Sequence, residues 1–349
     1  MYSMSFQRVA LAFTITAAVA LAPAGAAGQG CEPIRFTTPV NLGGIGQAYA
    51  QAGGQWQLGL SYRHLSSDEF FVGTVPSPEK GPGGQPPEFK IHTFVADIGY
   101  AFNDQFRLRL AVPFSTGQLV THTGANGAPI EQSASGIGDV SLMGEGWVLT
   151  PRTHQRGNIA FGLGFKAPTG SHTLKADNGF QGLADQRVQP GDGGWGILLG
   201  SQAFHQITER SNAYATGFYM VSPKSASDVT APNGKSWSVP DVYSARLGAT
   251  YDVQPDWGLA LSLGGRLDGI PVHDMLGGGD ASTVKTSSQI VYADPGLSVG
   301  RGKSTFTLSV PVRMWVNREK SELEQSTPGA VNGGGFAKYL VFASYAWRF

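Results

Sequence analysis

Apolar residues recur at every second position along most of this chain. A period of two puts alternate side chains on opposite faces of a β-strand, whereas a helix repeats every 3.6 residues. The sequence therefore predicts strands with one apolar face and one small or polar face. The clearest apolar rows lie in residues 56–62, 94–102, 106–114, 159–165, 257–263, 306–314 and 339–349.

Two features of these rows favour a membrane barrel over a soluble sandwich. The longer rows extend over roughly nine or more residues, which is the length that a tilted strand needs to cross a bilayer. Aromatic rings also gather at strand ends, where they would form a girdle at the membrane interface. These aromatic residues are Trp56, Phe102, Phe106, Tyr251, Trp257 and Trp347.

The connections between the rows alternate in length, which is the third feature. Long loops are expected at residues 66–88, 115–135, 169–194, 222–239, 270–287 and 318–335. Short turns are expected at residues 103–105, 150–157, 206–211, 252–256 and 301–303. Long extracellular loops and short periplasmic turns are typical of outer-membrane barrels. We therefore predict an all-β, transmembrane, antiparallel up-and-down β-barrel of about 12 strands, with residues 196–204 and 290–299 as its least regular strands.

The N-terminal residues have the pattern of a secretory signal. One positive charge at Arg8 precedes the apolar run 9–21, and small residues follow up to Ala27. This run is too short for a comfortable membrane-spanning helix, so an uncleaved anchor is the weaker alternative. We predict a signal peptide at 1–27, an N-terminal periplasmic extension or plug at 28–54, and the barrel at 55–349.

Composition narrows the class of protein further. The chain has 49 glycines and 11% aromatic residues but only 14% charged residues, which suits strands joined by frequent turns. Its formal net charge is zero, so no basic surface argues for nucleic acid as a partner. The one cysteine, Cys31, excludes a disulfide within the chain. A lipidation signal normally has an aliphatic residue three positions before the cysteine, so Gly28 and Gln29 fit such a signal poorly.

No motif in the chain makes a convincing catalytic or metal site. Gly296-Leu-Ser298-Val-Gly300 has the spacing of a nucleophile elbow, but it leads into another strand and not into a helix. The stretch 300–304 only faintly resembles a phosphate loop, and the histidines lack paired ligand spacing. We therefore predict no enzyme, no catalytic residue, no metal site and no cofactor. A barrel-embedded lipid hydrolase using Ser298 remains the weaker alternative.

Charged residues fall on the small-residue face of the strands, and charges cannot face lipid cheaply. They are therefore expected to point into the lumen, where cations outnumber acids. The predicted pore-lining residues are Arg63, Asp97, Arg107, Arg109, Asp139, Glu145, Lys166, Arg246, Arg266, Asp294, Arg313, Lys338 and Arg348. Two interpretations stay open: rings of cations that favour anionic solutes, or an ion-pair network that fills a narrow barrel.

Short motifs along the mature chain resemble a family of outer-membrane proteins named for the meta-pathway of phenol degradation. They are Ser61-Tyr-Arg63-His-Leu-Ser-Ser67-Asp68, Phe71-Val-Gly73, Val112-Pro113-Phe114, Gly136-Ile-Gly138-Asp139-Val140, Lys166-Ala-Pro168-Thr-Gly170 and Val310-Pro311-Val312. The resemblance implies a barrel related to transporters of hydrophobic or aromatic compounds, without catalytic residues. From the residues themselves, Pro113, Pro168 and Pro311 are expected near the outer strand ends, because proline cannot donate to the ladder.

The sequence thus favours a passive channel of the outer membrane for small hydrophobic, aromatic or anionic solutes. A plugged structural or surface-interaction barrel is the alternative from another class. The expected partners are outer-membrane lipid and lipopolysaccharide, a small-molecule solute, and the barrel-assembly machinery. The assembly machinery is expected to recognise Phe349, because this residue ends the last strand on the same aromatic face as Tyr345 and Trp347.

Overall fold

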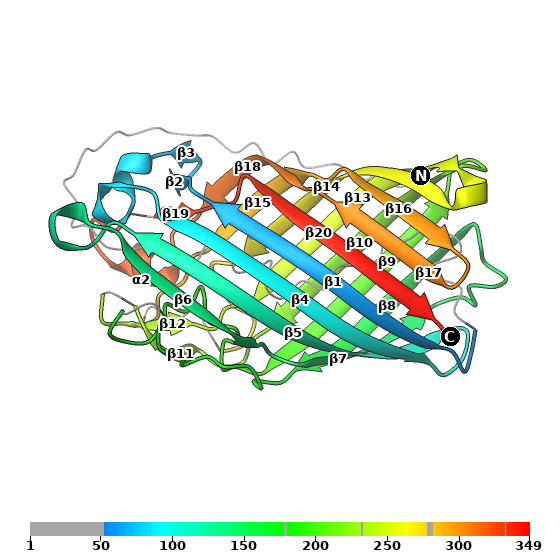
Figure 1. Cartoon of the computed structure of the whole chain (residues 1–349), viewed down its shortest axis with the longest axis horizontal. Helices are drawn as coiled ribbons and strands as arrows, with labels where there is room; N and C mark the ends of the chain where they lie inside the picture. The colour runs from blue at the N-terminus through cyan, green and yellow to red at the C-terminus, as the bar shows by residue number, and fades with distance from the viewer. Residues whose placement is uncertain (1–51, 178–179, 232, 278–281, 332) are drawn as a thin grey trace, which may run out of the picture.

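The computed structural model describes residues 52–177, 180–231, 233–277, 282–331 and 333–349. Within them, antiparallel strands close into one barrel of 12 strands, as predicted (Figure 1). The last strand pairs with the first, so the sheet closes on itself and satisfies its backbone groups internally. The predicted signal peptide, Cys31 and most of the segment 28–54 lie outside the described residues. Among those described, no helix is long and apolar enough to cross a membrane.

Most positions in the barrel are occupied by one strand, and three are shared by the pairs β6/β7, β15/β16 and β17/β18. The barrel strands are β1 (Trp56–Ser67), β4 (Glu88–Ala101), β5 (Phe106–Thr121), β6 (Ile130–Ile137), β7 (Ser141–Trp147), β8 (Gly157–Lys166), β9 (Gly196–Gln206), β10 (Ser211–Val221), β13 (Val242–Gln254), β14 (Leu259–Ile270), β15 (Ser288–Ala293), β16 (Gly296–Arg301), β17 (Ser304–Ser309), β18 (Val312–Arg318) and β20 (Tyr339–Arg348).

Short elements cover the end of the barrel where the long connections lie, which we call the loop end. They are β2 (Phe70–Val72), β3 (Val75–Pro76), β11 (Ala226–Thr230), β12 (Ser236–Ser238), β19 (Gly333–Gly335), the helix α2 (Glu322–Ser326), and the 3₁₀ turns η1 (Pro78–Lys80), η2 (Pro82–Gly84) and η3 (Ala125–Gly127). The opposite end, called the turn end, carries the short connections, the 3₁₀ turn η4 (Pro255–Trp257) and the C-terminus (Figure 1).

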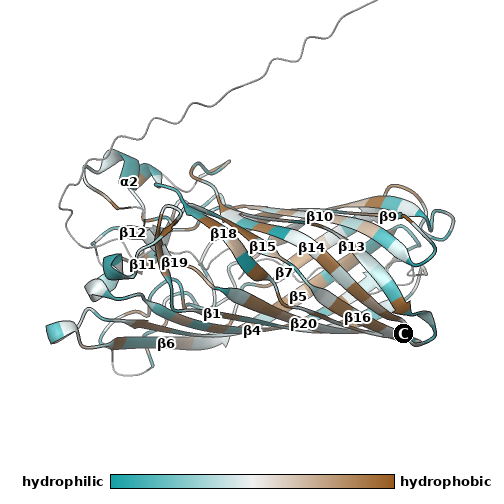
Figure 2. Ribbon diagram, turned by 90° about the horizontal axis from the view of Figure 1, so that it is seen from above, coloured by the Kyte–Doolittle hydropathy of each residue, from teal (hydrophilic) through white to brown (hydrophobic). Residues whose placement is uncertain are grey.

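An apolar belt surrounds the outside of the barrel, where brown segments follow the strands in Figure 2. Large side chains in it are strongly exposed, such as Leu163 at 64% and Leu247 at 68%. The predicted girdle at the turn end is present, and a second row of exposed rings lies nearer the loop end, including Phe94, Phe114 and Trp195. Between Phe106 and Phe114 a tilted strand rises roughly 20 Å along the barrel axis. This height approaches the apolar band of a membrane barrel.

Strand β5 continues beyond this belt, which corrects the expected loop at 115–135. It pairs with β7 up to Ala111 and with β6 from Phe114 onward, so Pro113 lies inside a long strand and not near its end. Proline lacks a donor, and the facing chain is interrupted there at residues 138–140. The Pro113 carbonyl accepts a hydrogen bond from the Gly138 amide at 2.8 Å. The break between β6 and β7 therefore lies opposite the position where Pro113 has no backbone N–H to donate.

The two faces of the strands exchange polarity where the strands leave the apolar belt. Toward the loop end the inward positions become apolar, as at Leu65, Phe89 and Leu119, while outward positions such as His64 and Lys90 become polar. The inward side chains join Tyr292 and other residues in a buried core. The barrel therefore has a polar lumen inside the belt and a dry, filled cap above it.

Two further sequence expectations are resolved by the strands. The least regular segments are strands: residues 196–204 fall within β9, and 290–299 are divided between β15 and β16. Ser298 lies within β16, opposite Ala260 and Thr307, with no helix after it. The local backbone therefore does not make a nucleophile elbow.

Candidate functional site

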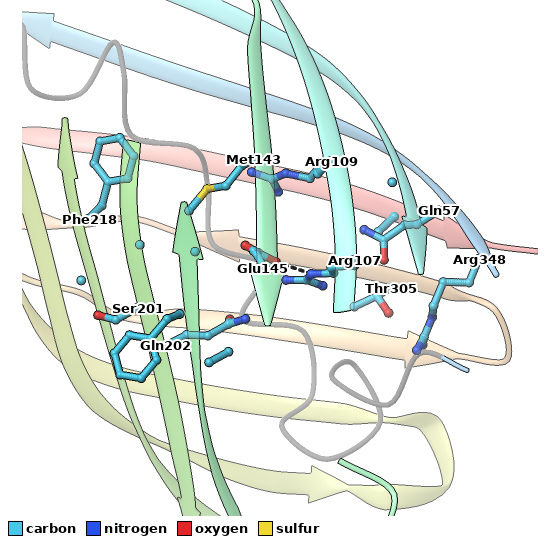
Figure 3. Close-up of a pocket in the computed structure, with 17 residues that line it drawn as sticks. Gln57, Arg107, Arg109, Met143, Glu145, Ser201, Gln202, Phe218, Thr305 and Arg348 are labelled. Carbon is cyan, nitrogen blue, oxygen red and sulfur yellow. Dashed lines mark hydrogen bonds and ion pairs between the residues drawn. The ribbon is translucent and has the colours of Figure 1, made fainter. Parts of the chain in front are cut away.

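Two of the cavities inside the barrel wall share three side chains in their linings. The turn-end cavity has a volume of about 80 Å³ and the loop-side cavity about 50 Å³. Arg109, Met143 and Phe218 belong to both linings, so they lie at the boundary between the cavities. Figure 3 shows them in the turn-end cavity. Other residues of the turn-end cavity include Gln57, Arg107, Glu145, Ser201, Gln202, Thr305 and Arg348. The lining of the loop-side cavity includes Arg63, Ser115, Asp139, Lys166, Pro190 and Met220.

Arginines dominate the charge of the turn-end cavity. Neighbouring inward positions of β5 carry Arg107 and Arg109, and the last residue of β20 supplies Arg348. Arg107 forms an ion pair with Glu145, its cross-strand partner on β7 (Figure 3). The guanidinium of Arg109 forms no hydrogen bond or ion pair with any residue that the structure describes. This cavity therefore holds a cation that is still able to bind an anion.

Met143 on β7 lies against the next two strands of the sheet because glycines leave room for it. A Cβ atom added to Gly162 or Gly200 would stand only 2.2 or 2.3 Å from the Met143 methyl. Those two glycines face the lumen from β8 and β9, so the thioether spans two strands. Together with Phe218 on β10, it gives the boundary between the cavities an apolar wall next to Arg109.

A buried ion triad closes the loop-side cavity. The ammonium of Lys166 lies 2.9 Å from Asp139 and 2.5 Å from Asp192, and it donates to the Gly194 carbonyl at 2.8 Å. The other oxygen of Asp139 accepts a hydrogen bond from the Gly170 amide at 2.9 Å. The inward orientation predicted for Asp139 and Lys166 therefore agrees with their burial. Their charges neutralise each other and hold the connection between β8 and β9.

A second set of charges fills the wall near β13 and β14. Arg246 and Arg266 are direct cross-strand partners, and each bonds to an acid: Arg246 to Asp294 at 2.6 Å, and Arg266 to Asp268 at 2.8 Å. Both acids are fully buried. Arg266 also stacks on Phe342 at 4.5 Å. These arginines are already occupied, which supports the ion-pair-network interpretation for this part of the barrel.

The remaining predicted pore residues divide into three groups. The carboxylate of Asp97 lies over Gly59 on the inner wall, and Arg63 lines the loop-side cavity. Arg313 lies in β18, where it pairs with Glu69 and stacks on Phe71 at 4.5 Å. Lys338 is exposed in the residue before β20. Its predicted inward position is wrong, because strand alternation begins only at Tyr339.

The connection between β8 and β9 turns into the barrel and blocks its loop end. Residues 184–192 are all buried. Arg187 pairs with Asp185 at 2.6 Å and lies 5.0 Å from the ring centre of Phe89 and 5.3 Å from that of Trp237. Val188 packs so closely on β5 that a Cβ at Gly117 would lie 2.9 Å from its own Cβ. We call this segment the occluding loop. Its inward path was not predicted from the sequence.

The neighbouring loop 271–287 contains a buried acid with an unusual pKa. The carboxylate of Asp274 lies 3.1 Å from the Lys285 ammonium and accepts a hydrogen bond from the Asp241 amide at 3.1 Å. Burial raises the pKa of Asp274 to about 6, although Lys285 acts in the opposite direction. The charge of Asp274 therefore changes near pH 6.

Comparisons with known proteins identify the fold. The barrel is similar to the crystal structure of the COG4313 outer membrane channel from Pseudomonas putida F1, with a TM-score of 0.62 and 14% sequence identity over 89% of this chain and 100% of that chain. The transport unit of the autotransporter AIDA-I from Escherichia coli (TM-score 0.44, 9% identity, 89% and 92% covered) and the CymD monoaromatic hydrocarbon channel (0.41, 10%, 89% and 94%) are less similar. No family model and no curated protein matches the sequence. The likeness to the first of these structures shows that the chain has the same barrel fold.

The site also contains residues that sequence reasoning missed. Gln57, Gln202 and Thr305 provide neutral polar groups to the turn-end cavity, and Met143 and Phe218 provide its apolar wall. Strand parity could have placed all of them inside, but only charged residues were considered. Across the described ranges, no three His, Cys, Asp or Glu side chains gather into an arrangement that could hold a metal.

Proposed function

We propose that this protein is a passive channel of the bacterial outer membrane for small solutes, held closed at its loop end in this conformation. One observation carries the proposal: polar cavities lie within the part of the barrel that an apolar belt surrounds. The long loops would face the cell exterior and the short turns the periplasm. The short motifs shared with the meta-pathway family support hydrophobic or aromatic compounds as one solute class, and the arginines support anions as another.

Planar bilayers with the purified mature protein provide the test. The expected wild-type result is rare or small conductance steps, because residues 184–192 occupy the loop end. Replacing residues 182–191 with a short Gly-Ser linker should increase the conductance several-fold. Shortening the β5–β6 tip at residues 124–128 is the matched control, since this change leaves the occluding loop in place. Far-ultraviolet circular dichroism and heat-dependent gel migration would establish that each variant is folded.

A second function, a closed barrel whose loops bind partners at the surface, is favoured by the buried core of the loop end. Leu119, Phe336 and Leu340 in that core have no exposed surface. If neither the wild type nor the linker variant conducts while both are folded, this second function replaces the channel. Conductance in the linker variant alone supports a channel that needs a signal to open.

A further inference from the structure

We infer that the turn-end cavity is a binding site for the carboxylate of a small monoanionic solute, with Arg109 as its principal ligand. This inference deepens the proposed channel function by naming a solute class and a position. Arg107 and Arg348 would stand beside the anion, and Met143 and Phe218 would contact its apolar body. The following observations carry it.

The charge balance of the lining favours an anion. Three arginines line the cavity, whereas its acidic lining residue, Glu145, is already paired with Arg107. Asp97, whose charge also acts on Arg107 and Arg109, lies over Gly59 and is absent from the lining. Even with both acids ionised, one positive charge is left over. A single excess charge suits a monoanion better than a dianion.

The state of Arg109 points to the ligand group. A guanidinium carries five N–H donors in a planar fork, and buried donors are normally satisfied. Arg109 is half-buried and bonds to none of the described residues, so its donors are left for a group outside them, such as water or a solute. A carboxylate matches that fork with two parallel hydrogen bonds. Arg246 and Arg266 make the contrast, because each already holds a buried aspartate.

The rest of the lining fits the remainder of such a solute. Met143 is the direct cross-strand partner of Arg109, so an apolar contact begins immediately next to the cation. Gln57, Gln202 and Thr305 can exchange hydrogen bonds with a second oxygen or with water (Figure 3). A volume of about 80 Å³ accommodates several water-sized groups. The cavity therefore fits the carboxylate and part of the apolar body of a small solute, and it is too small for a long acyl chain.

Isothermal titration of the folded mature protein in detergent, with benzoate as the probe, tests the inference. Benzamide has nearly the same shape without the charge, and detergent alone corrects for partitioning. We expect saturable benzoate binding that is about tenfold or more tighter than that of benzamide. Arg109→Gln should weaken benzoate binding about tenfold, and Arg109→Lys should restore part of it. Arg152→Gln, which removes a charge from an exposed turn-end residue outside the cavity, should have no effect.

The outcomes separate this inference from the channel proposal. Equal affinity for benzoate and benzamide, or equal behaviour of the Arg109→Gln and Arg152→Gln variants, overturns the carboxylate site. Conductance without any preference for benzoate would leave the channel standing and remove the site. Saturable, Arg109-dependent benzoate binding by a protein that never conducts would keep the site and remove the channel.

Discussion

Arg109 on β5 lies directly opposite Met143 on β7, and both residues line the two cavities of the lumen. A cation and a thioether thus meet where the cavities are separated. Neither cavity is large, so in the proposed channel a solute that passes from one to the other would have to move past this thioether. Methionine has three rotatable bonds, so this boundary can change without movement of the strands.

Met143→Ala should join the two cavities. The expected result, measured on the variant that has the linker in place of the occluding loop, is a larger single-channel conductance.

Gly200→Ala makes the opposite change, because its methyl group would meet the Met143 methyl and push it into the lumen. Conductance should then decrease. Gly302→Ala is not a suitable control because its backbone has a positive φ of 58°. Gly265→Ala is suitable, since open space surrounds its Cβ position. The same conductance in the Met143 and Gly200 variants would contradict the assignment.

Lys166→Met should release the occluding loop. Removing the ammonium leaves Asp139 and Asp192 buried without their cation, a change that typically costs about 3–5 kcal/mol. The cheapest response is for residues 184–192 to leave the barrel and return the acids to water. Limited proteolysis from the loop side should then cut this segment faster than in the wild type. Arg152→Gln again controls for loss of one positive charge, and an unchanged cleavage rate for Lys166→Met would show that the triad does not hold the loop.

Asp274 should make loop 271–287 more stable at acidic pH. Its pKa in the folded loop is about 6, above the ordinary value of 3.8, so folding favours the protonated acid. The resulting stability is complete below about pH 3.8 and is lost as the pH rises through about 6. Hydrogen exchange at the Asp241 amide, corrected for the intrinsic rate, should therefore be slower at pH 5 than at pH 7.

Asp274→Asn should remove this pH dependence. Asp228→Asn is the matched control, because Asp228 titrates outside this range: burial opposes the effect, but hydrogen bonds from His172 and Lys224 hold its pKa below the ordinary value. A pH dependence that survives in the Asp274 variant would assign it to another group.

The destabilisation caused by an arginine on the outer face should depend on whether its position lies inside or above the apolar belt. Leu163→Arg puts a guanidinium in the middle of the apolar belt. It should destabilise the protein folded in lipid vesicles by about 2–4 kcal/mol. Gln118→Arg changes an outward residue of β5 above the belt and should cost less than about 1 kcal/mol. Urea titrations of vesicle-folded protein measure both values. Equal costs for the two variants would mean that the belt does not contact lipid.

The sequence predicted the architecture because alternation and loop length are local signals. The alternation in a row such as 106–114 shows which side chains share a face of the strand. Closure of the sheet into a barrel is expected because every strand edge in a membrane must be paired. The inward positions of Arg107, Arg109 and Glu145 follow from the same parity. Local patterns were thus sufficient for the wall of the barrel and for much of the turn-end cavity.

The filled loop end could not be predicted in this way. Leu119 lies on the same face of β5 as Arg109. The alternation predicts that both side chains point inward, but it does not predict where along the strand the polar lumen ends and the buried core begins. The occluding loop has no period at all, so nothing local indicates that Val188 enters the barrel. Its position depends on distant partners, above all the open surface that Gly117 leaves on β5. Pro113 was misplaced because the break opposite it belongs to another part of the chain.

The continuous strands that run from the lipid belt into the cap restrict how this protein can change shape. β5 keeps one hydrogen-bonded neighbour, β4, from Ala101 and Arg107 at one end to Glu88 and Val120 at the other. Widening the barrel would break many such backbone hydrogen bonds at once. In the proposed channel, opening would therefore move the connection between β8 and β9 and leave the strands paired, so changes in the loops alone could alter how the protein opens.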